Sequence, residues 1–99
     1  MPDKDYRIYL RDGFMITVSV RMADRQVVSF VVRLIDARGL EERDLARYDT
    51  VHGWPHLDIL TPSDSLKEKR WMKVRTFGEA LNRAIEDFKA NYENYRQDH

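Results

Sequence analysis

The sequence predicts an α+β fold, an antiparallel sheet of four to five strands in a meander with one long C-terminal helix packed on one face. Apolar and polar residues alternate through Tyr6–Ile35, which is the period of half-buried strands. Short turn sequences separate the alternating runs. From Phe77 onward the apolar residues recur every three or four positions instead, as in an amphipathic helix. Strands followed by a single helix indicate a two-layer sandwich.

Length and composition limit the function classes. A chain of 99 residues predicts a single α+β domain, residues 1–99, with one core. The formal net charge is zero, so the overall field does not predict a polyanionic partner. The absence of cysteine excludes disulfides, thiolate metal sites and cysteine nucleophiles. The polar start and the lack of an apolar run near ~18 residues lead us to expect a cytoplasmic protein without membrane contact.

The first three strands are predicted from alternation and turn chemistry. Asp12-Gly13 lies between Tyr6–Leu10 and Phe14–Met22, and it predicts a two-residue type I′ turn because both of its positions need positive φ. A polar turn at Ala23–Gln26 follows. Val27–Ile35 carries apolar residues on both faces, which indicates either a central strand or a second face covered by a partner, such as the other subunit of a homodimer.

Three further strands and the helix complete the chain. Leu45–Asp49 and Leu57–Thr61 are predicted strands, and the charged segment Lys67–Val74 suits an edge strand. Thr76 and Glu79 form a capping-box sequence at the start of the helix. The helical stripe predicted to face the sheet consists of Phe77, Leu81, Ala84, Ile85, Phe88, Tyr92 and Tyr95.

The segment Arg47–Asp58 is the strongest candidate for chemistry. RNA cleavage through the 2′-hydroxyl needs a base, an acid and a cation. His52, His56 and Arg47 could supply them, because histidine titrates near neutral pH. We therefore take His52, His56, Arg47 and Asp49 as candidate catalytic residues. The alternative is a structural turn in which Gly53-Trp54-Pro55 is rigid and Trp54 packs on the core.

A metal site is the other chemical interpretation of this segment. Both histidines together with Asp49 or Asp58 would form a ligand set that divalent metals favour. Their spacing matches no known metal-binding motif, and Gly53 and Pro55 exclude a helix on which the two rings would align. We therefore predict no metal and no cofactor.

The segment Lys67–Arg75 is a candidate nucleic-acid surface, since its five cations face a single acid, Glu68. Lysine and arginine side chains could follow a phosphate backbone while an exposed indole stacks on a base. The candidate RNA-binding residues are Lys67, Lys69, Arg70, Trp71 and Lys73. The alternative is a solvated edge strand in which Trp71 is a core residue.

Arg47-Tyr48-Asp49, Pro55-His56 and the closing helix resemble the TumE-like family of toxin–antitoxin toxins and related small families of unknown function. The similarity in layout covers residues 25–95. It implies a strand meander with a C-terminal helix, a cytoplasmic prokaryotic toxin, an antitoxin-type protein partner and action on RNA. Where the family pattern leads us to expect a further histidine after His56, this chain has Leu57-Asp58. The competing hypothesis is a non-catalytic interaction module that dimerises through Val27–Ile35.

Overall fold

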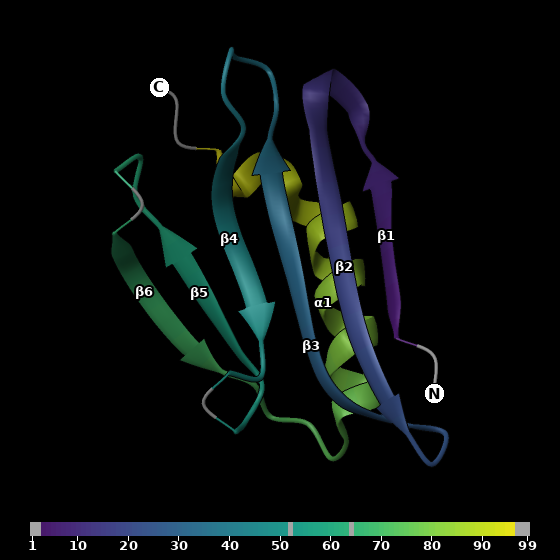
Figure 1. Cartoon of the computed structure of the whole chain (residues 1–99). Coiled ribbons are helices and arrows are strands. Elements are labelled where there is room, and N and C mark those ends of the chain that lie inside the picture. Colours follow the sequence, from purple (N-terminus) through teal and green to yellow (C-terminus); the bar gives the residue numbers. More distant parts are fainter. Residues whose placement is uncertain (1–2, 52, 64, 97–99) are drawn as a thin grey trace.

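The computed structural model describes residues 3–51, 53–63 and 65–96, and in these ranges the chain forms a sheet with one α-helix across one face (Figure 1). The strands are β1 (Lys4–Tyr9), β2 (Phe14–Ala23), β3 (Gln26–Asp36), β4 (Arg43–Asp49), β5 (His56–Leu60) and β6 (Leu66–Trp71). The helix is α1 (Phe77–Asn91), and the 3-10 segments are η1 (Arg11–Gly13) and η2 (Tyr92–Tyr95). The predicted α+β class with a C-terminal helix is confirmed. No helix in the described ranges is long and apolar enough to cross a membrane.

The sheet is a meander of six strands in the order β1-β2-β3-β4-β5-β6, and every neighbouring pair is antiparallel. The predicted count of four to five strands was wrong. Strands predicted at both edges, Tyr6–Leu10 and Lys67–Val74, are nevertheless present as β1 and β6, which are polar and largely exposed. Edge strands pair through backbone hydrogen bonds and need no apolar face of their own, so their side-chain pattern is weak.

The first two turns both use positive φ, but they differ from expectation in length. Asp12 and Gly13 have φ of 60° and 83°, as predicted. Arg11 joins them, and the Leu10 amide donates to the Phe14 carbonyl at 2.8 Å, so this loop has three residues rather than two. The second turn is the two-residue one: Asp24 and Arg25 have φ of 50° and 65° between the paired residues Ala23 and Gln26.

The core lies between α1 and one face of the sheet, and α1 runs behind β2 and β3 (Figure 1). Its buried residues come from β2–β5 and α1: Phe14, Ile16, Val18, Val20, Phe30, Val32, Leu34, Leu45, Ala46, Tyr48, Leu57, Ala80, Ala84 and Phe88. The predicted helical stripe is confirmed, since all of its members belong to this core or pack against it. Ala80 and Ala84 are fully buried, and their small side chains let the helix approach the sheet closely.

Both ends of α1 are held by side-chain hydrogen bonds. At the N-cap the Thr76 hydroxyl accepts from the Glu79 amide at 3.1 Å, as predicted. The Glu79 carboxylate accepts from the amide of Arg75 at 3.4 Å instead of from the N-cap amide. The α-helix is shorter than the ~20 residues expected, because Asn91 leaves helical geometry at φ −125°, ψ 14° and the chain continues as η2.

A hydrogen-bonded clamp joins the C-terminal half of α1 to β4 and η2. The Asp87 carboxylate accepts from the Tyr48 hydroxyl at 2.6 Å, the Tyr95 hydroxyl at 2.5 Å and the Asn91 amide at 2.8 Å. Burial, followed by the hydrogen bond to Asp87, raises the pKa of Tyr48 and of Tyr95 above the ordinary tyrosine value of 10.0. Both phenols are therefore held in the protonated form as hydrogen-bond donors.

Candidate functional site on the open face of the sheet

The face of the sheet turned away from α1, here called the open face, carries the candidate residues. Strand alternation explains this, because Tyr48 and Leu57 point into the core and their neighbours must point the other way. The register then aligns these neighbours across strands. Arg47 is paired with Asp58 and Asp58 with Lys69, while Asp49 is paired with His56 and His56 with Trp71.

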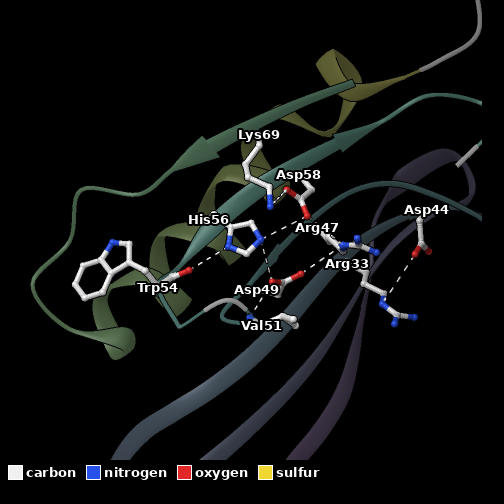
Figure 2. Close-up of polar contacts among 9 residues, drawn as sticks. All are labelled: Arg33, Asp44, Arg47, Asp49, Val51, Trp54, His56, Asp58 and Lys69. Atoms are coloured by element: carbon white, nitrogen blue, oxygen red, sulfur yellow. Dashed lines mark hydrogen bonds and ion pairs between the residues drawn. The ribbon is translucent and has the colours of Figure 1, made fainter. Parts of the chain in front are cut away.

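Five of these residues form a polar cluster: Arg47, Asp49, His56, Asp58 and Lys69 (Figure 2). His56 Nε2 lies 3.1 Å from Asp49 Oδ1 and 3.5 Å from Asp58 Oδ2. Arg47 Nε lies 3.4 Å from Asp49 Oδ2 and 3.5 Å from Asp58 Oδ2. The imidazole and both aspartates are buried although they lie on the open face, and His56 is only 1% exposed. The cluster adjoins a shallow pocket of about 220 Å³ lined in part by Val31, Arg33 and Val51.

The loop after β4 sets the geometry of this cluster. Asp49 Oδ1 accepts from the Val51 amide at 3.1 Å, which orients the carboxylate. The Gly53 amide donates to the Thr50 carbonyl at 2.9 Å, and Gly53 has φ 92°, a conformation that favours glycine. The Trp54 indole donates to the Met72 carbonyl at 2.9 Å and packs edge-on against Phe77. The predicted turn at Gly53-Trp54-Pro55 is therefore present, but Trp54 is 41% exposed and does not belong to the core, and the turn orients functional groups of the cluster.

One hydrogen bond fixes a proton on His56. His56 Nδ1 lies 3.0 Å from the Trp54 carbonyl oxygen, which can only accept, so Nδ1 carries a hydrogen. The other nitrogen, Nε2, points toward both carboxylates (Figure 2). A ring with a hydrogen on both nitrogens could lie between the two anions. Alternatively, the Nε2 lone pair and the two carboxylates could bind the same cation.

Two buried polar atoms of the cluster lack hydrogen-bond partners among the described residues. They are Arg47 Nε and Asp58 Oδ1. Lys69 Nζ lies 3.8 Å from Asp58 Oδ1, which is beyond hydrogen-bond distance. An unsatisfied buried group costs about 1–3 kcal/mol. Two buried atoms of the cluster therefore have unused hydrogen-bonding capacity, which is not expected of an ion-pair network that only stabilises the fold.

The predicted RNA-binding residues separate onto two sides of β6. Lys69 and Trp71 lie on the open face, where Trp71 is 55% exposed. The Trp71 ring is 5.1 Å from the His56 ring and 5.6 Å from Lys69 Nζ. Arg70 points to the helix side and hydrogen-bonds Glu68, which lowers the pKa of that carboxyl. The interpretation of Trp71 as a core residue was wrong, because the indole stands at the edge of the open face.

The helix side of β5 and β6 borders a cavity of about 660 Å³. Lys67 and Arg70 line it together with Asp87 and Tyr95. Lys73 lies beyond β6, and its carbonyl accepts from Arg83 at 3.5 Å. Arg70 and Lys73 also line a pocket of about 340 Å³ that Trp71 borders, and Lys69 is the cation whose Nζ lies over the Trp71 ring.

Three of the four predicted catalytic residues, Arg47, Asp49 and His56, come together. His52 lies outside the described residues. The sequence-based predictions did not include Asp58 among the four candidate catalytic residues, and they assigned Lys69 to a different surface. Both belong to this cluster, and strand register would have found them, since Asp58 follows His56 by two positions on β5.

A family model for a domain of unknown function, DUF7718, matches residues 1–99, so the chain belongs to that family. No curated protein and no solved structure matches the chain. The family carries no functional description and makes no link to TumE-like toxins, so the function has to be argued from the geometry of the open face.

Proposed function

We propose that this chain binds single-stranded RNA across the open face of its sheet, with Trp71 as the stacking platform. The exposed position of Trp71 beside Lys69 is the observation that carries the proposal. A base can stack on a solvent-facing indole whatever its sequence, and such stacking contributes about 1–3 kcal/mol per base. The lysine beside the ring supplies a partner for the adjoining phosphate.

A row of cations continues from this platform across the sheet. The cross-strand pairs Arg7–Thr17, Thr17–Arg33, Arg33–Arg47, Arg47–Asp58 and Asp58–Lys69 form one line on the open face. Four of its six side chains are cationic, and its acid, Asp58, is buried. Neighbouring strands lie ~4.8 Å apart, so the row provides closely spaced phosphate partners running from β1 to β6. Although the chain has no net charge, this row of side chains is strongly basic.

Contact with RNA is better supported than cleavage by His56. An acid or base must reach the 2′-hydroxyl, and His56 is sealed with Nδ1 engaged by the Trp54 carbonyl. Arg47 is accessible, with 39% of its side chain exposed, and could contact a phosphate. We therefore assign Arg47 a binding role and give His56 and Asp49 the role of positioning it.

Fluorescence anisotropy with a labelled single-stranded RNA of about ten nucleotides tests the proposal. Trp71→Ala should weaken binding about 5- to 150-fold, and Trp71→Phe should retain most of it. Lys69→Gln should weaken binding and reduce the slope of log K against log salt by about one. Arg70→Gln is the matched control on the opposite side of β6 and should change neither. Equal effects of Lys69→Gln and Arg70→Gln would disprove binding on the open face.

The resemblance to TumE-like toxins extends the proposal to growth arrest and an antitoxin-type partner. Expression in a bacterial host should arrest growth, and Trp71→Ala should relieve the arrest. No arrest by the parent chain would remove the toxin role and leave RNA binding to be judged by anisotropy.

The alternative function is a non-catalytic interaction module that dimerises through Val27–Ile35. On the open face of β3, Ile35 is buried, Val31 is half-buried and Arg33 is exposed, so this strand presents little free apolar surface. A dimer in light scattering, combined with no RNA binding by the parent chain, would favour the alternative.

A further inference from the structure

We propose that Asp49, His56 and Asp58 bind one divalent transition-metal ion, with Mn²⁺ and Zn²⁺ as the best candidates. This inference goes beyond RNA binding, although the two sites share Arg47, and it replaces the sequence-based prediction of no metal. The ligand atoms of the three residues all lie within 4.8 Å of one another. One imidazole with two carboxylates is a donor set suited to both ions.

The two distances from His56 Nε2 to the aspartate oxygens are close to those between ligands of a bound ion, and the two aspartates have ligand oxygens within 4.8 Å of each other. At metal–ligand distances of ~2.1 Å, neighbouring ligands are about 3.0 Å apart in octahedral geometry and about 3.4 Å apart in tetrahedral geometry. His56 Nε2 is 3.1 Å from the Asp49 oxygen and 3.5 Å from the Asp58 oxygen. The three side chains can therefore share one ion with only small movements.

Backbone groups hold the ligands in the orientation that a metal requires. The Trp54 carbonyl accepts from His56 Nδ1, which leaves Nε2 as the coordinating nitrogen. The Val51 amide donates to Asp49 Oδ1 and fixes that carboxylate. Both contacts come from the loop between β4 and β5, so the ligand set is organised before an ion binds.

A buried ligand group that lacks a hydrogen bond, with only the ion pair to Lys69 Nζ at 3.8 Å, is the independent observation. The Asp58 side chain is only 6% exposed, and its Oδ1 accepts no hydrogen bond from the described residues. The same carboxylate holds Oδ2 toward His56 and Arg47. A buried carboxylate oxygen without a donor is a group that a cation would satisfy.

Arg47 is the cation that would compete with the ion for the two aspartates, although it contacts Asp49 Oδ2 and not the Oδ1 atom that faces His56. Its Nε lies 3.4–3.5 Å from both aspartates without making a hydrogen bond to a described residue. Its side chain is 39% exposed, so it can turn outward when a metal binds. The two aspartates then balance the charge of the dication, and Arg47 and Lys69 are released to solvent or to an anionic ligand.

Isothermal titration of the metal-stripped full chain with MnCl₂ and with ZnCl₂, each alone, tests the site. We expect one equivalent per chain, and Asp58→Asn should weaken binding at least ~10-fold. Asp44→Asn is the control, because Asp44 is an acid paired with Arg33 outside the cluster, and it should bind as the parent does. Equal affinities of the parent and Asp58→Asn would overturn the proposal and place the ion elsewhere in the chain.

Two measurements keep the test informative if Asp58→Asn is poorly folded. Pulsed EPR of the Mn²⁺-loaded parent should detect the nitrogen coupling of an imidazole, and a spectrum without nitrogen coupling would overturn the site. Arg47→Met keeps all three ligands and removes the competing cation, so it should bind the metal several-fold more tightly. If a folded Arg47→Met variant bound the metal more weakly than the parent, the guanidinium would not be competing with the ion for the aspartates.

Discussion

Replacing Asp87 by Asn should strongly destabilise the fold, because one carboxylate holds three donors from three elements. Tyr48 of β4 and Tyr95 of η2 donate to the same oxygen at 2.6 and 2.5 Å, and Asn91 donates to the other. A hydrogen bond to a charged acceptor contributes about 1.5–3 kcal/mol, compared with about 1 kcal/mol for a neutral one. An amide also replaces one acceptor oxygen with a donor. The loss should be about 2 kcal/mol.

Urea unfolding followed by circular dichroism measures this loss directly. A change of about 2 kcal/mol corresponds to a fall in Tm of about 10 °C for a domain of this size. Glu86→Gln is the matched control, since Glu86 neighbours Asp87 on the exposed face of α1, and it should stay within about 0.5 kcal/mol of the parent. A free energy of unfolding for Asp87→Asn that equals the control's would refute the clamp.

Three further predictions concern pH and backbone. The raised pKa values of Tyr48 and Tyr95 stabilise the fold fully below pH 10.0, and this contribution should be lost as the pH rises above it, because the unfolded phenols ionise first. Unfolding measured from pH 8 to pH 11 should therefore show a smaller decline in the Tyr48→Phe/Tyr95→Phe variant. Arg25→Gly should stabilise the chain by about 1 kcal/mol in thermal unfolding, since Arg25 has φ 65° in a two-residue turn. Gly53→Ala should destabilise it by about 1 kcal/mol through φ 92° alone, because no described atom beyond its chain neighbours lies within 4 Å of an added Cβ. Unchanged stability of Arg25→Gly or of Gly53→Ala would contradict the backbone argument made for that position.

Side-chain periodicity predicted the layers of the fold because burial imposes it. Residues such as Ile16, Val18 and Val32 alternate because each strand has one face on α1, and the helical stripe around Phe88 covers that face. Both edge strands were predicted as segments, but β1 and β6 have no comparable apolar face, and the total was given as four to five strands. The local sequence also did not predict that Arg11 is a third residue of the first loop. The loop length depends on the hydrogen bond between Leu10 and Phe14, which closes the loop around Arg11, Asp12 and Gly13.

The candidate site was predicted in part because chemistry is readable from residue type, whereas proximity depends on register. Arg47, Asp49 and His56 were chosen by type from one segment, and they do meet. The meeting of His56 with Asp58 and Lys69 needed the pairing of β5 with β4 and β6. The split of the basic segment follows from the same alternation, which sends Lys69 and Arg70 to opposite faces. Trp71 is exposed because β6 is the last strand and has no neighbour to cover its open face.

The two proposals share Arg47, and this predicts that RNA and metal binding are coupled. In the described structure Arg47 is held by Asp49 and Asp58, and Lys69 lies near Asp58. A dication at the aspartates would free both cations for phosphates, so metal should raise RNA affinity, and RNA should raise metal affinity by the same factor. Anisotropy with saturating Mn²⁺ should show tighter RNA binding by the parent chain. Because Mn²⁺ also binds to RNA itself, Asp58→Asn serves as the control for that effect. The RNA affinity of Asp58→Asn should change only as much as Mn²⁺ bound to the RNA changes it. If Mn²⁺ changed the RNA affinity of the parent and of Asp58→Asn equally, Arg47 would not move from the aspartates to a phosphate when the metal binds. The cluster and the cation row would then act independently.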